Sequence, residues 1–144
     1  MKFLLLILLL PIYKSHTNKI SENEVYCYIR SLGIKNPKIV LKQAIYETGH
    51  FKSKIFKSKN NLFGFRRSKS YLTFNSWQSC VVYYKNWQEK YYRDTTQDYY
   101  IFLQKKNYSG YKEFHYSNEL KKIKIRASLI CDSIEISMDT YEEK

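Results

Sequence analysis

Apolar residues recur at helical spacing over most of this chain, and that periodicity constrains its fold more than any other feature. The chain has 144 residues with only 4 Gly and 2 Pro, so few positions interrupt a helix. Ser21 and Glu24 have the spacing of a capping box, which predicts a first helix that Gly33 ends. Pro37 fits the first position of a second helix, and Gly49 is its expected end. The sequence therefore predicts a mainly α fold.

Three further helices are expected in the second half of the chain. Asn75 and Gln78 resemble a cap for the first of them. Its core-facing side comprises Trp77, Val81, Tyr84, Gln88 and Tyr91. A shorter helix covers about 97–106, and a last long helix begins near Ser117. The apolar stripe of that last helix comprises Leu120, Ile123, Ala127, Ile130 and Ile134.

The segment 61–74 differs from the rest because it is rich in Gly, Ser and aromatic residues and shows no helical period. A polar turn at 66–70 precedes four alternating residues, 71–74, and this pattern predicts a small β hairpin. A chain of this length should form one domain, for which we expect the bounds 18–144.

The first residues predict a targeting segment rather than part of the fold. Lys2 precedes an unbroken apolar run, Phe3–Leu10. This pattern is typical of a secretory signal peptide, here 1–17, whose cleavage site Ser15 and Thr17 locate only loosely. The run is far shorter than the ~20 apolar residues of a membrane span. We therefore expect an exported protein without a stable membrane span; the alternative is a buried N-terminal helix.

The chain has three widely spaced cysteines, which are Cys27, Cys80 and Cys131. They allow at most one disulfide, and we expect instead that all three are small buried residues on helices. The histidines are equally scattered, at His16, His50 and His115. They lack the spacing of metal ligands, so we expect no metal site and no cofactor.

The charge of the chain predicts an acidic partner. Lys and Arg number 25 against 13 Asp and Glu, giving a net charge of +12. Disorder is not expected, because 44% of the residues are hydrophobic. The basic run 121–126 suggests nucleic-acid binding. However, Ile123 and Ala127 place part of that run on the core-facing stripe of the last helix, so we expect no nucleic acid as partner.

Glu47 is the carboxylate in the least expected position. It lies three residues after Ala44 and seven after Val40, on the apolar face of the second expected helix. Burial and the negative end of the helix dipole both disfavour its ionised form, which raises its pKa. A carboxylic acid that stays protonated near neutral pH can serve as a general acid. The alternative is that Glu47 reaches solvent or pairs with a nearby lysine.

Three motifs around and after Glu47 carry a resemblance to a known family. They are Ala-Ile-Tyr-Glu-Thr-Gly (44–49), Asn-Asn-Leu-Phe-Gly-Phe (60–65) and Tyr-Leu-Thr-Phe-Asn-Ser-Trp-Gln-Ser (71–79). In this order, the three motifs resemble those of the glucosaminidase family of bacterial peptidoglycan hydrolases (glycoside hydrolase family seventy-three). Two later segments, 102–108 and 116–120, resemble the same family, so that the resemblance runs from about 25 to 127.

The resemblance implies a lysozyme-like, mainly α (α+β) fold: a helical bundle around a substrate cleft, with a much reduced β hairpin. It implies an endo-β-N-acetylglucosaminidase that hydrolyses β-1,4 bonds of peptidoglycan glycan strands. Glu47 matches the catalytic glutamate, and Tyr116 matches a tyrosine that lines the active site. The other matched positions, expected to bind substrate, are Asn61, Leu62, Phe63, Gly64, Tyr71 and Trp77. Packing in the core is the alternative for Tyr116, Leu62, Phe63 and Trp77.

The sequence departs from a conventional glycosidase because no Asp or Glu lies between Glu47 and Glu89. Such enzymes use two carboxylates. We therefore expect one general acid, with the substrate's own 2-acetamido group as nucleophile. Four acids remain candidates through tertiary folding, namely Asp94, Asp98, Glu113 and Glu119.

The same acid-free interval contains eight cations, which are Lys52, Lys54, Lys57, Lys59, Arg66, Arg67, Lys69 and Lys85. They either rim the cleft and attract an anionic glycan or form an ordinary solvated face. The missing second acid also leaves room for a non-catalytic cell-wall-binding protein on the same fold. Within the enzyme class, the choice between glucosaminidase, muramidase and N-glycan cleavage stays open. We expect a monomer.

Overall fold

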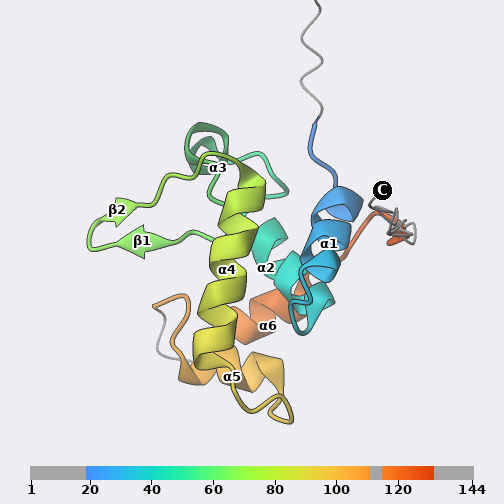
Figure 1. Ribbon diagram of the computed structural model, residues 1–144, viewed down its shortest axis with the longest axis vertical. Helices are drawn as coiled ribbons and strands as arrows, with labels where there is room; N and C mark the ends of the chain where they lie inside the picture. Colours follow the sequence, from blue (N-terminus) through green and yellow to red (C-terminus); the bar gives the residue numbers. More distant parts are fainter. Residues whose placement is uncertain (1–18, 111–114, 132–144) are drawn as a thin grey trace, which may run out of the picture.

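The computed structural model describes residues 19–110 and 115–131, and it is mainly helical with one very small hairpin (Figure 1). The predicted signal peptide (1–17), Glu113 and Ile134 lie outside the described residues. In chain order the elements are α1 (Glu22–Ser31), α2 (Pro37–Thr48), α3 (Lys54–Lys59), β1 (Arg66–Arg67), β2 (Ser70–Tyr71), α4 (Trp77–Tyr91), α5 (Tyr99–Lys105) and α6 (His115–Lys122). The predicted mainly α fold with a reduced β hairpin is confirmed.

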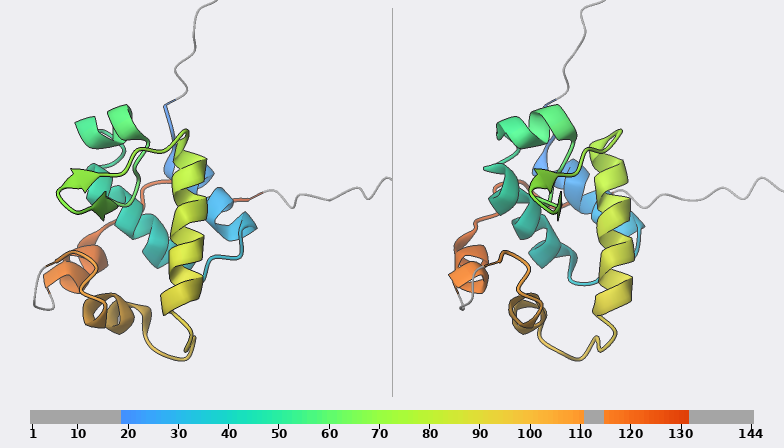
Figure 2. Two further views of the ribbon diagram at one scale, coloured as in Figure 1. Left: turned by 60° about the vertical axis from the view of Figure 1, so that its left-hand side comes forward. Right: turned by 90° about the vertical axis from the view of Figure 1, so that its left-hand side faces the viewer.

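The helices pack as neighbours around α2. Helix α1 packs on α2 and on α4, while α6 packs on α2 and on α5. The two views in Figure 2 show the hairpin and α3 on one side of α2, with α5 and α6 at the opposite end of α4. The end of α2 therefore lies between the hairpin and the last helix, which are far apart in sequence.

The helix ends follow the predicted signals with one exception. The Ser21 hydroxyl accepts from the backbone N–H of Glu24 at 3.1 Å, and the Glu24 carboxylate accepts from the backbone N–H of Ser21 at 2.7 Å. Gly33 and Gly49 end their helices with φ of 70° and 55°. The predicted Asn75 cap is wrong. Ser76 caps α4 instead, because its extended backbone lets its hydroxyl accept from the N–H three residues on.

The predicted long last helix is also wrong. Helix α6 ends at Lys122, and residues 123–131 form no helix. Their backbone is bonded to α1 instead: the Glu22 carboxylate accepts from the N–H groups of Arg126 and Ala127 at 2.6 and 3.0 Å. Asn23 accepts from the N–H of Ile130 and donates to its carbonyl. These long-range hydrogen bonds replace the helical ones, which the apolar periodicity alone does not reveal.

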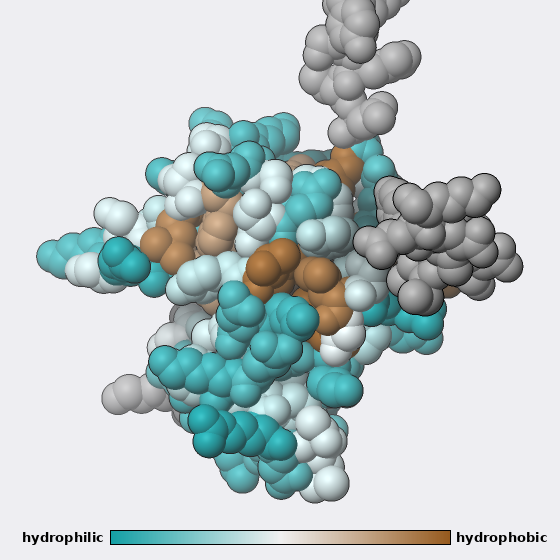
Figure 3. Space-filling model, viewed as in Figure 1, coloured by the Kyte–Doolittle hydropathy of each residue, from teal (hydrophilic) through white to brown (hydrophobic). Residues whose placement is uncertain are grey.

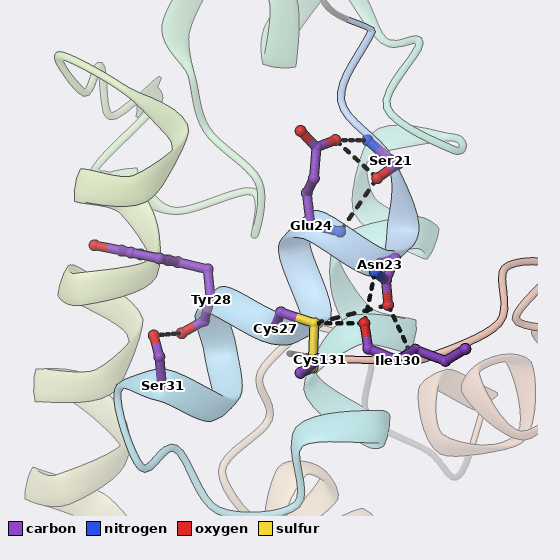
Figure 4. Close-up of a disulfide and its surroundings, with 8 residues drawn as sticks. All are labelled: Ser21, Asn23, Glu24, Cys27, Tyr28, Ser31, Ile130 and Cys131. Atoms are coloured by element: carbon purple, nitrogen blue, oxygen red, sulfur yellow. Dashed lines mark hydrogen bonds between the residues drawn. A yellow bond between two sulfur atoms is a disulfide. The ribbon is translucent and has the colours of Figure 1, made fainter. Parts of the chain in front are cut away.

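A disulfide between Cys27 and Cys131 fixes this segment to α1 (Figure 4). The Cα atoms of the two cysteines lie 5.4 Å apart across a sequence separation of 104. The expectation of three free, buried cysteines is therefore wrong for this pair and right for Cys80, which is fully buried and free. Cys131 lies in the non-helical segment that the sequence assigned to a helix.

The hairpin pairs Arg66 with Tyr71 and Arg67 with Ser70 in antiparallel register. Its turn residue Ser68 has a positive φ of 54°. The predicted small hairpin is confirmed, although each strand has only two residues.

The core lies between the helices, and the surface is mostly polar. On the face in Figure 3, hydrophilic side chains cover most of the area and hydrophobic ones form small patches. The largest fully buried side chains include Tyr84, Tyr99, Phe63, Ile29, Leu41 and Gln43. Within 19–110 and 115–131, no helix is long and apolar enough to cross a membrane.

Removing the disulfide should destabilise the fold. A bridge that closes a loop of this length contributes roughly 2–5 kcal/mol, mainly by restricting the unfolded chain. We expect a reductant to lower the melting temperature of the wild type, as followed by circular dichroism. The control is Cys27→Ser/Cys131→Ser, which keeps Cys80 and should melt at the lower temperature with or without reductant. A wild-type melting curve that is unchanged on reduction would contradict this pairing.

Candidate active site

Glu47 occupies the last turn of α2, where its partly buried carboxyl group meets the first turn of α6. The Tyr116 hydroxyl donates to Glu47 Oε1 at 2.9 Å, and Tyr116 is only 3% exposed. Tyr116 is itself held between two aromatic rings, edge-on to Tyr46 and stacked with Tyr108. Helix packing therefore brings together two residues that are 69 positions apart.

Gly64 lies against the other oxygen of the same carboxyl group. A Cβ atom at this position would stand 2.8 Å from Glu47 Oε2, which is closer than van der Waals contact allows. The backbone of Gly64 also has a φ of +67°, a conformation that side chains disfavour. Both the close approach and the backbone conformation favour glycine here, because any side chain would be strained and would push the Glu47 carboxyl group aside.

Burial is the main influence on the ionisation of Glu47. Loss of hydration raises the pKa of this carboxyl group, while the Tyr116 hydrogen bond and the positive charge of Arg66 act in the opposite direction. The net effect is a raised pKa. The protonated acid therefore persists to a higher pH than in an exposed glutamate, as a general acid requires.

Glu47 opens onto a groove of about 820 Å³. Its aromatic lining consists of Tyr46, Phe63, Phe65, Tyr71, Trp87, Tyr91 and Tyr108. Its polar lining consists of Glu47, Arg66, Lys106, Asn107 and Ser109, and the glycines Gly64 and Gly110 complete it. Aromatic faces beside cations and one carboxyl group can hold a polar chain with apolar ring faces, such as an anionic glycan.

The sequence-predicted residues fall into two groups. Glu47, Phe63, Gly64 and Tyr71 line the groove. Tyr116, Asn61, Leu62 and Trp77 are not among its lining residues.

Asn61 and Trp77 have structural surroundings instead. The Asn61 amide donates to the carbonyls of Phe65 and Leu72 at 2.9 Å each, and its oxygen accepts from the Phe65 N–H. Asn61 thus fixes the loop that holds Gly64 against Glu47. Trp77 packs edge-on against Tyr28 with ring centroids 5.3 Å apart.

Several groove residues were missed by sequence reasoning, notably Tyr46, Trp87, Tyr91, Lys106 and Tyr108. Tyr46 directly precedes the key glutamate, and Lys106 and Tyr108 lie in the matched segment 102–108, so the sequence held a signal for these three. Trp87 and Tyr91 had no signal that pointed to the groove. Gln43 was also missed, although it is fully buried and lies four residues before Glu47 on the same helical face. A polar side chain on a core-facing stripe is the signal that identified Glu47, and it applied equally to Gln43.

Fewer cationic side chains line the groove than the sequence suggested. Of the eight cations in the acid-free interval, only Arg66 is among the lining residues, where its guanidinium lies over the Tyr71 ring. The ammonium of Lys106, outside that interval, lies 3.7 Å from the centroid of Tyr91. Lys85 instead pairs with Glu89.

The described part of the groove lining contains one carboxylate, Glu47. Asp94 bonds to Thr96, Asp98 caps α5, and Glu119 pairs with Lys122. Within 19–110 and 115–131, no group of three or more His, Cys, Asp and Glu residues could hold a metal ion.

The family model for glucosaminidase, described as mannosyl-glycoprotein endo-β-N-acetylglucosaminidase, matches residues 24–129. The chain belongs to the glucosaminidase family. No curated protein and no solved structure matched the chain. Family membership supports a peptidoglycan-type glycosidase role, a glycan substrate and action in the cell envelope or outside the cell.

Replacing Gly64 with alanine should disturb the carboxyl group of Glu47. We expect Gly64→Ala to lower glycosidase activity by roughly 10- to 100-fold, because the new methyl group displaces Oε2. The matched control is Gly49→Ala. Gly49 has a similar φ of +55° but nothing within 4 Å of an added Cβ atom. Both variants should lose about 1–2 kcal/mol of stability, from melting curves, because both place a side chain at positive φ. Equal activity in the two variants would contradict the role of the Gly64 contact.

Proposed function

We propose that the protein is an endo-β-N-acetylglucosaminidase that hydrolyses β-1,4 glycosidic bonds of peptidoglycan, with Glu47 as general acid. One observation supports this most strongly: a partly buried carboxyl group with a raised pKa lies in an aromatic groove, held by Tyr116 and Gly64. An exposed surface carboxylate would have neither the pKa nor the fixed orientation.

In the first step, Glu47 gives its proton to the glycosidic oxygen as the bond from that oxygen to the anomeric carbon breaks. The carbonyl oxygen of the substrate's 2-acetamido group forms the new bond to the anomeric carbon, and the leaving sugar departs as a neutral alcohol. In the second step, water attacks the anomeric carbon and the acetamido bond breaks. The Glu47 carboxylate accepts the proton of that water and is restored as an acid.

The other groove residues have roles in binding. We assign Tyr71, Trp87 and Tyr91 to contacts with sugar faces, because aromatic rings pack on the apolar faces of pyranoses. We assign Arg66 and Lys106 to anionic groups of the polymer. Tyr116 is buried beneath the groove, and we assign it to holding the carboxyl group of Glu47 in position through their hydrogen bond.

We further propose that the protein acts as an exported monomer. A disulfide between Cys27 and Cys131 suits an oxidising compartment outside the cytosol. The alternative function is a non-catalytic wall-binding protein, which the single carboxylate in the described groove would also fit.

Glu47→Gln separates the enzyme from the wall-binding protein. We expect it to abolish clearing of cell-wall suspensions, a loss of at least about 100-fold, because the amide N–H is far too weak an acid to protonate the glycosidic oxygen. Its sedimentation with cell walls should persist, since the aromatic and cationic lining is unchanged. Wild-type protein that binds walls but never clears them would establish the wall-binding alternative and overturn the catalytic proposal.

The products of wild-type digestion test the bond and the mechanism. We expect mass spectrometry to find the new reducing end on N-acetylglucosamine, whereas a muramidase would leave it on the muramyl sugar. Proton NMR of the first products should show the β anomer, because two displacements at one carbon retain its configuration. Inversion would exclude the acetamido nucleophile.

A variant of a remaining candidate acid tests the same point. We expect Glu113→Gln to clear cell-wall suspensions as fast as the wild type, since no second carboxylate is required.

A further inference from the structure

A chain of buried hydrogen bonds runs from Glu47 through the core to the backbone of Lys35. Beyond Tyr116 it passes through Gln43, Tyr84, Tyr99 and Gln88. The four residues are at most 3% exposed and come from α2, α4 and α5. The far end lies at the turn between α1 and α2, away from the groove.

The backbone of Lys35 determines the orientation of the Gln88 amide. The Lys35 N–H donates to Gln88 Oε1 at 2.7 Å, and the Lys35 carbonyl accepts from Gln88 Nε2 at 3.0 Å. A backbone N–H can only donate and a backbone carbonyl can only accept, so this amide has one possible orientation. Its second N–H must then donate to the Tyr99 hydroxyl, which lies 2.8 Å from Nε2.

The direction of each following hydrogen bond is a consequence. Since the Tyr99 oxygen accepts from Gln88, its proton is directed to the Tyr84 oxygen, 2.6 Å away. Tyr84 therefore donates to Gln43 Oε1. The Gln43 amide then presents Nε2 to the Tyr116 oxygen at 3.3 Å, and Tyr116 can only donate to Glu47 Oε1. If the hydrogen bonds ran in the opposite direction, the Tyr99 hydroxyl would have to donate to Gln88 Nε2, which is itself a donor.

We propose that this chain is a positioning device that makes Glu47 Oε1 a permanent hydrogen-bond acceptor and keeps the acid proton on Oε2, the oxygen beside Gly64. Gln43, Tyr84, Tyr99 and Gln88 are thus positioning residues that act through Tyr116. The proposal rests on the proposed function, because it specifies which oxygen of the general acid carries the proton.

Within 19–110 and 115–131, two further polar groups interact electrostatically with Glu47, and neither sets this order. They are the hydroxyl of Tyr108, which donates to the Phe63 carbonyl, and the guanidinium of Arg66. The positive charge of Arg66 lowers the pKa of Glu47 and so favours the ionised carboxylate over the acid. The Tyr116 hydrogen bond also favours the ionised form. If the chain loses its direction, Tyr116 can turn its proton to Gln43, and the pKa of Glu47 should rise further.

The test measures the ionisation of Glu47 by 13C NMR titration of the full-length protein, with Glu47→Gln to identify the signal. Tyr84→Phe removes the donor that orients Gln43, and Gln88→Met removes the anchor. The matched control is Tyr92→Phe. Tyr92 is a buried tyrosine that packs edge-on against Tyr99 and bonds to the Gln97 carbonyl, outside the chain.

We expect Tyr84→Phe to raise the midpoint by roughly 0.5–1 pH unit, Gln88→Met to raise it less, and Tyr92→Phe to leave it unchanged. Tyr116→Phe sets the upper limit, because it removes the bond entirely. Two variants at different helix positions guard against the failure of one to fold. No shift in the folded variants, a downward shift, or an equal shift in Tyr92→Phe would overturn the proposal. The downward direction is what simple loosening predicts, because water entry lowers the pKa of a buried carboxyl.

The pH profile of wall clearing gives a second, independent readout. The general acid must be protonated, so activity falls as the pH rises through the pKa of Glu47. In Tyr84→Phe this loss should occur at a higher pH than in the wild type. If the wild type clears no walls but the NMR midpoints move as expected, the proposed function fails and the proton order stands.

Discussion

The hydrogen bond from Tyr116 to Glu47 is the interaction on which the candidate site depends. It joins the end of α2 to the start of α6, and no stretch of local sequence connects these elements. A carboxyl group with few water contacts needs such a partner, because an unpaired one would cost several kcal/mol. The hydroxyl fixes one oxygen of the carboxyl group, while burial raises the pKa, so that the acid keeps a proton that it can transfer.

The polar core behind this bond explains why the fold tolerates so many tyrosines inside. Among the described residues, no buried side-chain nitrogen or oxygen lacks a hydrogen-bond partner. Helix α4 serves both sides of the arrangement: Tyr84 and Gln88 lie in the core, while Trp87 lines the groove. A fully satisfied buried network specifies one arrangement of its helices more strictly than apolar packing does. The same network that orders the core therefore orders the acid.

Local signals in the sequence were enough to predict the first two helices and the burial and raised pKa of Glu47. Ser21, Gly33 and Gly49 act through their own backbone and nearest neighbours, so periodicity and caps reveal them. The prediction of a long last helix was wrong because the spacing of Ile123 and Ala127 is helical, whereas hydrogen bonds to Glu22 on α1 determine the backbone conformation there. The disulfide and most of the groove lining were not predicted for the same reason, since they depend on contacts between distant segments.

The segment after α6 links the disulfide to the site. Tyr116 lies in the first turn of α6, and the chain leaves that helix directly into the stretch that Glu22, Asn23 and Cys27 hold against α1. Lys42 on α2 adds a further contact, from its ammonium to the Lys121 carbonyl at 3.4 Å. Helix α6 is only eight residues long, too short to be stable alone. Its position, and with it the Tyr116 hydroxyl, therefore depends on α2 at one side and on the bridged segment that follows. A covalent link remote from the groove thus contributes to the placement of its acid.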